Sequence, residues 1–386
     1  MEAPQMMTRL TGRALAGIVV AVAAALAGTA CGHPFTPAGY SPARPYSTVR
    51  PWTPPPPVAP PPRGPMTVGV DLYDAQDYSV AETRVLGERA ISYIANTLRV
   101  KSIGIAWDYA VPGWNSDTVL PASPGTPSLA DIAALTSIAR SHGLRVSYRA
   151  LFTVTGVNGQ SERLKPAHTK AWLNSLLTTE TPALRLAASE HVGEFVVGTE
   201  TASIEGSPLW HGFFTRAAAL YHGTLSYATW GGSPQAGGFF SAKRALPPVG
   251  RTGLYGATAY PSVSLPSDAP VSKLTSAWES FLAHAPARVL RRTALDEVGI
   301  PAADGMYADP WEWNHVTGRP DDEVQARWFL AACAAAEREH MRAIYFWNVN
   351  LSDNPGAGLF ASAVRFEGRP AAEAAIRSCQ RSAETG

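Results

Sequence analysis

Two glutamates each end a short apolar run, and together they could perform acid–base and nucleophilic chemistry. Glu200 closes the run that begins at Glu194, and Glu297 closes the run that begins at Thr293. Loop-forming residues follow both, so each run is predicted to be a buried strand with a carboxylate at its carboxyl end. In α/β enzymes built from parallel strands, this end of the sheet carries the chemistry. Two carboxyl groups that face one cleft are the minimum set of catalytic groups for hydrolysing a glycosidic bond.

The positions of these glutamates depend on eight apolar runs that alternate with longer helical patterns. The runs predict strands at 67–72, 102–107, 145–151, 194–199, 224–230, 253–260, 292–297 and 343–348. Helices are predicted at 79–98, 128–142, 168–190, 207–221, 271–284, 321–339 and 370–378. Ser128 as an N-cap and Gly143 just beyond the end show the usual start and stop signals, and Pro182 is expected to interrupt the third helix. The glycine- and proline-rich segment 231–251 is expected to hold at most a short helix.

Eight strand–helix units over residues 66–386 favour an α/β protein with a single (β/α)8 TIM barrel. The main alternative is a doubly wound open sheet, which usually carries a glycine-rich phosphate loop after its first strand. Here the first run ends in Asp71-Leu72-Tyr73-Asp74 instead. Counted in this way, Glu200 ends the fourth strand and Glu297 the seventh. Because a barrel gathers all strand ends around one mouth, the two carboxylates can face a common substrate.

Residues near other strand ends could line a sugar-binding site beside this pair. Trp347 could offer its flat apolar face to a pyranose ring, and Tyr260 could donate a hydrogen bond that keeps Glu297 ionised. Arg149 could bind a hydroxyl or orient a carboxylate, whereas Asp296 is expected to point to the opposite face of its strand. The remaining candidates for the cleft are Trp107, Asp108, Tyr227, Trp230, Trp311, Trp313 and Asn348. Glu205, Glu312 and His211 lie in loops or at helix starts and are secondary candidates.

Five short motifs follow one another in a characteristic order. They are Val197-Gly198-Thr199-Glu200, Gly223-Thr224-Leu225-Ser226-Tyr227-Ala228, Ala259-Tyr260-Pro261, Asp296-Glu297-Val298-Gly299 with Pro310-Trp311-Glu312-Trp313, and Tyr345-Phe346-Trp347-Asn348. The series resembles glycoside hydrolase family 113, a family of clan A retaining enzymes that includes β-mannanases. The resemblance implies that Glu200 is the general acid and base, and that Glu297 is the nucleophile that forms a glycosyl-enzyme. It also implies an oligosaccharide or polysaccharide substrate with β-glycosidic linkages, β-mannosidic ones included.

Three departures from the family pattern concern sugar specificity rather than catalysis. Ile300 stands where a tyrosine or another polar residue often occurs, Val349 stands in place of a second tryptophan, and Thr258-Ala259 precedes Tyr260 where an aspartate is more usual. The alternative function is a non-catalytic carbohydrate-binding barrel of the cell envelope. An envelope amidase or deacetylase would need a metal set or a Ser/His pair at the strand ends, and the sequence offers neither.

Composition and cysteine spacing argue against nucleic acid as a partner and against a metal or cofactor. The net charge is +1, only 16% of residues are charged, and no basic cluster is present, so nucleic-acid binding is not expected. There is no Cys/His spacing of the zinc type, so neither a metal nor another cofactor is expected. Cys333 and Cys379 lie on the last two predicted helices, where they could form one disulfide or remain two buried thiols.

The N-terminus has the features of an export signal. Arg9 and Arg13 precede an apolar stretch at 14–28, which is too short to span a membrane and typical of a signal peptide. Cys31 follows small residues, as a lipidated cysteine would, so residues 1–31 are predicted to be a signal peptide with a lipobox. Residues 32–65 are predicted to be a proline-rich disordered linker. The protein is therefore expected outside the cytoplasm, as a membrane-anchored lipoprotein or, alternatively, as a secreted protein or one with an uncleaved anchor.

Overall fold

Eight parallel strands close into a barrel in the computed structural model, which describes residues 64–74, 76–122, 124–155, 161–231, 254–313, 316–355 and 364–385. β1 (Thr67–Tyr73) pairs with β2 (Ser102–Val111) on one side and with β9 (Ala343–Asn350) on the other. Between β2 and β9 lie β4 (Arg145–Val154), β5 (Glu194–Thr199), β6 (Thr224–Trp230), β7 (Tyr255–Thr258) and β8 (Thr293–Val298). The predicted barrel is confirmed, with Glu200 after its fourth strand and Glu297 on its seventh.

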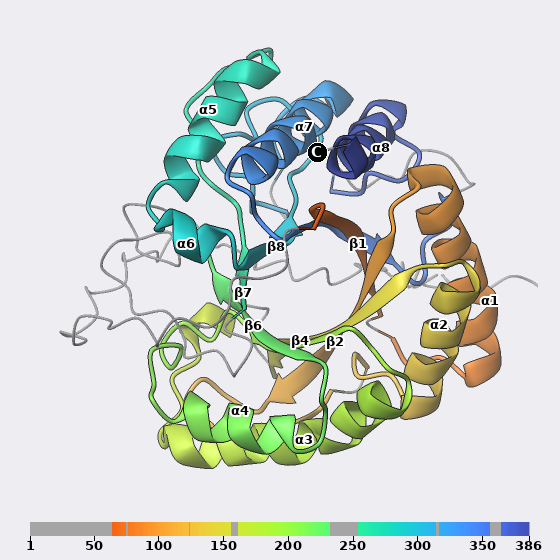
Figure 1. Ribbon diagram of the computed structural model, residues 1–386, viewed down its shortest axis with the longest axis vertical. Helices are drawn as coiled ribbons and strands as arrows, with labels where there is room; N and C mark the ends of the chain where they lie inside the picture. Colours follow the sequence, from red (N-terminus) through yellow and green to blue (C-terminus); the bar gives the residue numbers. More distant parts are fainter. Residues whose placement is uncertain are drawn as a thin grey trace, which may run out of the picture.

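The helices surround the strands (Figure 1). They are α1 (Val80–Ser92), α2 (Leu129–Ser141), α3 (Thr169–Ser189), α4 (Trp210–Ala218), α5 (Val271–Leu282), α6 (Ala287–Leu290), α7 (Asp322–Arg338) and α8 (Pro370–Thr385). A π-helical segment, Tyr93–Leu98, extends α1, and a short 3-10 helix spans Ser161–Arg163. Ser128 forms a capping box with Asp131, which satisfies backbone donors at the start of α2.

Two of the differences from the expectations concern α3 and the edge of β2. α3 continues through Pro182, although proline cannot donate the backbone hydrogen bond of its position. Its apolar face, which includes Trp172 and Leu176, stays buried on both sides of the proline, and this packing keeps the helix continuous. A two-residue strand, β3 (Leu120–Pro121), adds antiparallel to β2, and it is too short to leave a pattern in the sequence.

A layer of aromatic side chains fills the space between strands and helices. Trp107, Trp172, Trp210, Trp278 and Trp328 are all fully buried there. Trp172 and Trp210 meet edge-on at 6.4 Å between ring centroids, and Trp278 lies 5.0 Å from Trp328. Such pairs contribute about 0.5–1.5 kcal/mol each beyond the burial of their area. This layer stabilises the outer side of the barrel and leaves its interior to polar side chains.

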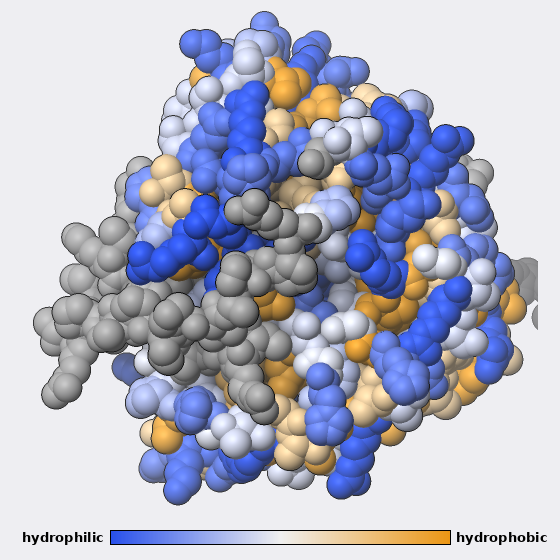
Figure 2. Space-filling model, in the orientation of Figure 1, coloured by the Kyte–Doolittle hydropathy of each residue, from blue (hydrophilic) through white to orange (hydrophobic). Residues whose placement is uncertain are grey.

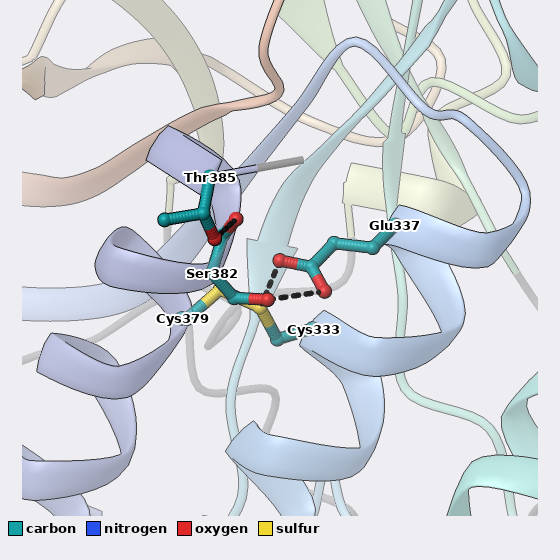
Figure 3. Close-up of a disulfide and its surroundings, with 5 residues drawn as sticks. All are labelled: Cys333, Glu337, Cys379, Ser382 and Thr385. Atoms are coloured by element: carbon teal, nitrogen blue, oxygen red, sulfur yellow. Dashed lines mark hydrogen bonds between the residues drawn. A yellow bond between two sulfur atoms is a disulfide. The ribbon is translucent and has the colours of Figure 1, made fainter.

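The last helix is joined covalently to its neighbour. Cys333 of α7 and Cys379 of α8 form a disulfide, with their Cα atoms 5.8 Å apart (Figure 3). Beside it, Ser382 donates a hydrogen bond of 2.8 Å to Glu337. Of the two alternatives that the sequence leaves open, the structure contains the disulfide.

The surface of the described part is largely polar. On the face shown in Figure 2, hydrophilic residues predominate and hydrophobic ones gather in small patches between them. The large hydrophobic residues that are exposed, Val85, Leu120, Leu129 and Leu209, are spread over different elements. Within the described ranges, no helix is both long and apolar enough to cross a membrane. The predicted signal peptide, Cys31, nearly all of the linker and most of segment 231–251 lie outside the described residues.

Candidate active site

Glu200 directly follows β5 and has a left-handed backbone, with φ at 56°. For a residue other than glycine, this conformation costs roughly 1–2 kcal/mol of conformational free energy. Two hydrogen bonds hold it: its N–H donates to the carbonyl of Ala228 at 2.9 Å, and its Oε1 accepts from Thr258 Oγ1 at 2.6 Å. Only 7% of Glu200 is exposed. Backbone strain that the surrounding structure maintains in this way is typical of functional sites.

Glu297 lies on β8 and is 5% exposed. Its Oε2 accepts a hydrogen bond of 2.9 Å from the hydroxyl of Tyr260, which follows β7. Its backbone carbonyl accepts from the N–H of Ala259 at 2.8 Å, so the two segments are linked both through side chains and through the backbone. The expected donation from Tyr260 to Glu297 is therefore present.

The two glutamates interact electrostatically. Burial raises the pKa of Glu297 well above its usual range, and the nearby carboxylates of Glu200 and Asp71 raise it further. The Tyr260 hydroxyl and the Arg149 guanidinium act in the opposite direction. Burial and the like charge of Glu200 thus disfavour the ionised form of Glu297, and the Tyr260 hydroxyl and the Arg149 guanidinium offset part of that cost.

Arg149 belongs to an ion triad inside the barrel. Its Nε lies 2.6 Å from Asp71 Oδ1, and its Nη1 lies 2.9 Å from Asp296 Oδ1. These residues come from β4, β1 and β8, no two of which pair with each other in the sheet, so the contacts cross the barrel interior. The guanidinium also lies 4.1 Å from the ring centroid of Tyr345. Burial raises the pKa of Asp71 to about 8, although Arg149 opposes this rise.

The positions of Asp296 and Arg149 in this triad bear on two expectations from the sequence. Asp296 points into the barrel rather than away from it, because the register of β8 shifts between Leu295 and Val298 and breaks simple alternation. Arg149 forms ion pairs with two carboxylates and is 3% exposed, which fits the expected orientation of a carboxylate better than a contact with a sugar hydroxyl. Its charge also lowers the pKa of Glu297.

Two glycines make room for this triad. A Cβ atom at Gly104 would lie 2.1 Å from Asp71 Oδ1 and 2.4 Å from Arg149 Nε. A Cβ atom at Gly256 would lie 1.8 Å from Asp296 Oδ2. All three distances are shorter than real Cβ contacts. A glycine inside a strand pattern often marks such a close approach, and this was the available sequence signal.

Aromatic residues form a cluster with Tyr260, the residue that donates to Glu297. Trp347 is 1% exposed, and its ring centroid lies 5.6 Å from that of Tyr73. Trp313 meets Tyr260 edge-on at 5.6 Å. These four rings belong to one cluster with Ala106 and Leu151. Tyr73, the last residue of β1, donates a hydrogen bond to Asp108, and it is not among the candidates from the sequence.

Trp107 and Tyr227 require a correction. Trp107 packs edge-on against Tyr148 and Phe195 in the layer between strands and helices. The ring of Tyr227 lies 5.0 Å from Trp210 of α4, and its hydroxyl bonds to Glu205 at 3.2 Å. Both side chains are fully buried on the outer side of the barrel, so they do not line the cleft.

The remaining candidates lie near strand ends. Asn348 accepts a hydrogen bond of 2.5 Å from Arg365 Nη1 and is 2% exposed. Trp230 and Trp311 are partly buried, at the end of β6 and after β8 respectively. The buried Glu205 accepts from Thr229 Oγ1 at 2.5 Å and from the Trp230 N–H at 3.4 Å, which supports the end of β6. Within the described ranges, no group of histidine, cysteine, aspartate and glutamate side chains is arranged to hold a metal ion.

Comparison with protein families gives a match over most of the barrel. The model of Glycoside Hydrolase Family 113 matches residues 88–355. None of the curated proteins matches the chain.

Solved structures with the same fold include several glycoside hydrolases. A GH113 β-1,4-mannanase aligns with a TM-score of 0.66 at 14% identity, over 82% of this chain and 99% of that one. The GH113 β-mannanase AaManA from Alicyclobacillus acidocaldarius, in complex with ManMIm, aligns with a TM-score of 0.63 at 19% identity, over 83% and 97%. GH5_18 from Streptomyces cattleya, in complex with GlcNAc, aligns with a TM-score of 0.53 at 15% identity, over 84% and 81%. At these identities the alignments establish a shared fold.

Proposed function

Because the chain belongs to glycoside hydrolase family 113, we propose that it cleaves β-glycosidic linkages with retention of configuration at the anomeric carbon. The observation that carries the proposal is the pair of buried glutamates, Glu200 after β5 and Glu297 on β8, whose carboxyl groups interact inside one barrel. Membership of the family and the site geometry support Glu200 as the general acid and base and Glu297 as the nucleophile.

In the first step, Glu200 donates its proton to the glycosidic oxygen as the bond to the anomeric carbon breaks. The carboxylate of Glu297 attacks that carbon, and the leaving alcohol departs with the proton. In the second step, Glu200, now ionised, removes a proton from water as the water oxygen attacks the same carbon and releases Glu297. The hydrogen bond from Tyr260 stabilises the ionised form of Glu297, which attacks in the first step and is released in the second.

The substrate proposed first is a β-mannoside. Family membership supports this choice, since the family includes β-mannanases, and AaManA is named as a β-mannanase. The cluster of Tyr73, Tyr260, Trp313 and Trp347 beside the nucleophile supports a sugar ligand, because aromatic faces pack well against pyranose carbons. The three sequence departures at Thr258, Ile300 and Val349 make other β-linked sugars the next substrates to test.

Substitution of each glutamate tests the mechanism. Glu200→Gln and Glu297→Gln should each lower the hydrolysis of β-mannan and of aryl β-mannosides by about a hundredfold or more, because each removes one role in proton or glycosyl transfer. Glu190→Gln, at a surface ion pair with Arg140, is the matched control and should keep wild-type activity. NMR of the first-formed product should show the β-anomer. Wild-type protein that binds the oligosaccharide without cleaving it would favour the alternative, a non-catalytic carbohydrate-binding barrel.

We also propose that the protein acts outside the cytoplasm. The signal-like N-terminus with Cys31 and the proline-rich residues after it support export with lipid attachment. The Cys333–Cys379 disulfide supports an oxidising compartment. The mass of the N-terminal peptide of the mature protein distinguishes a lipidated Cys31 from simple cleavage or retention of the signal.

A further inference from the structure

Thr258 connects the two proposed catalytic acids. It is the last residue of β7 and is fully buried. Its backbone is the register partner of Glu297 on β8 on one side and of Trp230 on β6 on the other. Its hydroxyl donates a hydrogen bond of 2.6 Å to Oε1 of Glu200. One residue therefore lies beside the nucleophile through the sheet and reaches the acid through its side chain.

The backbone fixes the position of the Thr258 hydroxyl. Its carbonyl accepts a hydrogen bond of 2.8 Å from the N–H of Gly231. A Cβ atom at Gly231 would lie 2.1 Å from that carbonyl oxygen, so the close approach depends on a glycine. The next residue, Ala259, donates to the Glu297 carbonyl. Because threonine is branched at Cβ, its χ1 is also restricted, and the hydroxyl has a defined direction.

We propose that Thr258 is the positioning residue for the acid/base Glu200. The hydroxyl donates to Oε1, so Oε1 acts as the acceptor oxygen of the carboxyl group. The proton that Glu200 transfers is then carried by Oε2, the oxygen that faces the glycosidic bond. Thr258 thus helps to fix the rotamer of the Glu200 side chain. The inference rests on the proposed function, because it assigns a task to the same pair of glutamates.

The consequence is specific to the protonation step. A sugar alcohol is a poor leaving group and requires the proton from Glu200 as the glycosidic bond breaks. A dinitrophenolate leaves as a stable anion and does not require it. An acid that is misdirected but still present should therefore slow the cleavage of natural linkages much more than the cleavage of dinitrophenyl glycosides. General damage to the fold would slow both alike.

The test compares Thr258→Val, Thr258→Ser and Thr293→Val in the full-length protein, with a dinitrophenyl β-glycoside and the corresponding oligosaccharide. Valine keeps the shape of threonine and removes the hydroxyl, and serine restores it. Thr293 is an equally buried threonine on β8 whose hydroxyl donates to the Val289 carbonyl, so it serves as the matched control. Thermal melting of each variant checks that it is folded.

For Thr258→Val, kcat/KM for the oligosaccharide should fall roughly tenfold or more, as expected for loss of a hydrogen bond to a carboxyl group. The kcat/KM for the dinitrophenyl glycoside, which reports the first step and not the later role of Glu200 as a base, should change less than about threefold. Thr258→Ser should recover most of the loss, and Thr293→Val should behave as the wild type. If Thr258→Val slows both substrates equally or neither, the inference is wrong while the proposed function stands. If the wild-type protein hydrolyses no β-glycoside, the proposed function fails and the inference fails with it.

Discussion

The hydroxyl of Tyr260 is the direct hydrogen-bond donor to the proposed nucleophile. It lies 2.9 Å from Glu297 Oε2, and its ring packs edge-on against Trp313. Burial and the neighbouring carboxylates raise the pKa of Glu297, and this hydrogen bond lowers it. The donor therefore offsets part of the cost of keeping a buried carboxylate ionised. It does so without adding a positive charge at the anomeric carbon.

Tyr260→Phe should move the acidic limb of the kcat/KM profile to higher pH. The ionised form of Glu297 loses a donor, so its pKa rises, and more of the enzyme has a protonated nucleophile at low pH. The shift should be up to about one pH unit, given the usual net value of one hydrogen bond. Tyr221→Phe removes a buried hydroxyl that donates to the Val192 carbonyl, and it should leave the limb in place. An acidic limb that stays unchanged in Tyr260→Phe would refute the role given to this hydroxyl.

At the level of the strands, small residues in the sheet allow the polar interior. Gly104 on β2 and Gly256 on β7 lie against the side chains of the Asp71–Arg149–Asp296 triad. A buried charge that loses its partner costs several kcal/mol, so the triad is stable only while all three groups stay in place. The strand sequences must therefore provide the space as well as the charges.

Gly256→Ala should destabilise the protein by about 3 kcal/mol or more, because a Cβ atom would overlap the Asp296 carboxylate and separate it from Arg149. Urea unfolding measures the change. Gly212→Ala, in α4 with no atom within 4 Å of its added Cβ, is the control and should stabilise by about 0.5–1 kcal/mol. Equal stabilities of Gly256→Ala and the wild type would show that the interior can rearrange.

The sequence predicts the strands well and the direction of their side chains poorly. Each of the eight apolar runs became a barrel strand, and Ser79 and Ser128 begin helices as their spacing indicates. Barrel strands, however, are buried on both faces, so hydrophobic alternation does not show which side chains point inward. For this reason the sequence predicts Trp107 and Tyr227 in the cleft, whereas the expectation for Asp296 fails because the register of β8 shifts. The hydrogen bond from Thr258 to Glu200 joins different strands and has no local signal.

At the scale of the whole molecule, the outer ring of helices is closed by a covalent bond. α7 and α8 lie side by side, and the Cys333–Cys379 disulfide joins them (Figure 3). α8 also packs against β1, so the bond ties the end of the chain to the wall of the barrel near its beginning. A disulfide across 46 residues restricts the unfolded chain more than the folded one.

Replacement of both cysteines by serine should lower the free energy of unfolding by about 2–4 kcal/mol. The melting temperature should fall, and a reducing agent should lower the melting temperature of the wild type toward that of the variant. Glycosidase activity at 25 °C should be retained, because the bond joins two helices outside the barrel. A melting temperature that responds neither to the substitutions nor to reduction would contradict this role.

The pairing of β1 with β9 dictates when the barrel can close. Thr67 near the start of the described chain lies opposite Ala343 near its end, so synthesis and any passage through a membrane deliver the two strands at very different times. Without β9, a sheet that includes β1 would have an unpaired edge, and such edges can recruit strands from other molecules. Contacts between such distant segments also form slowly. We therefore expect self-association to be most favoured in the interval before the last strand arrives.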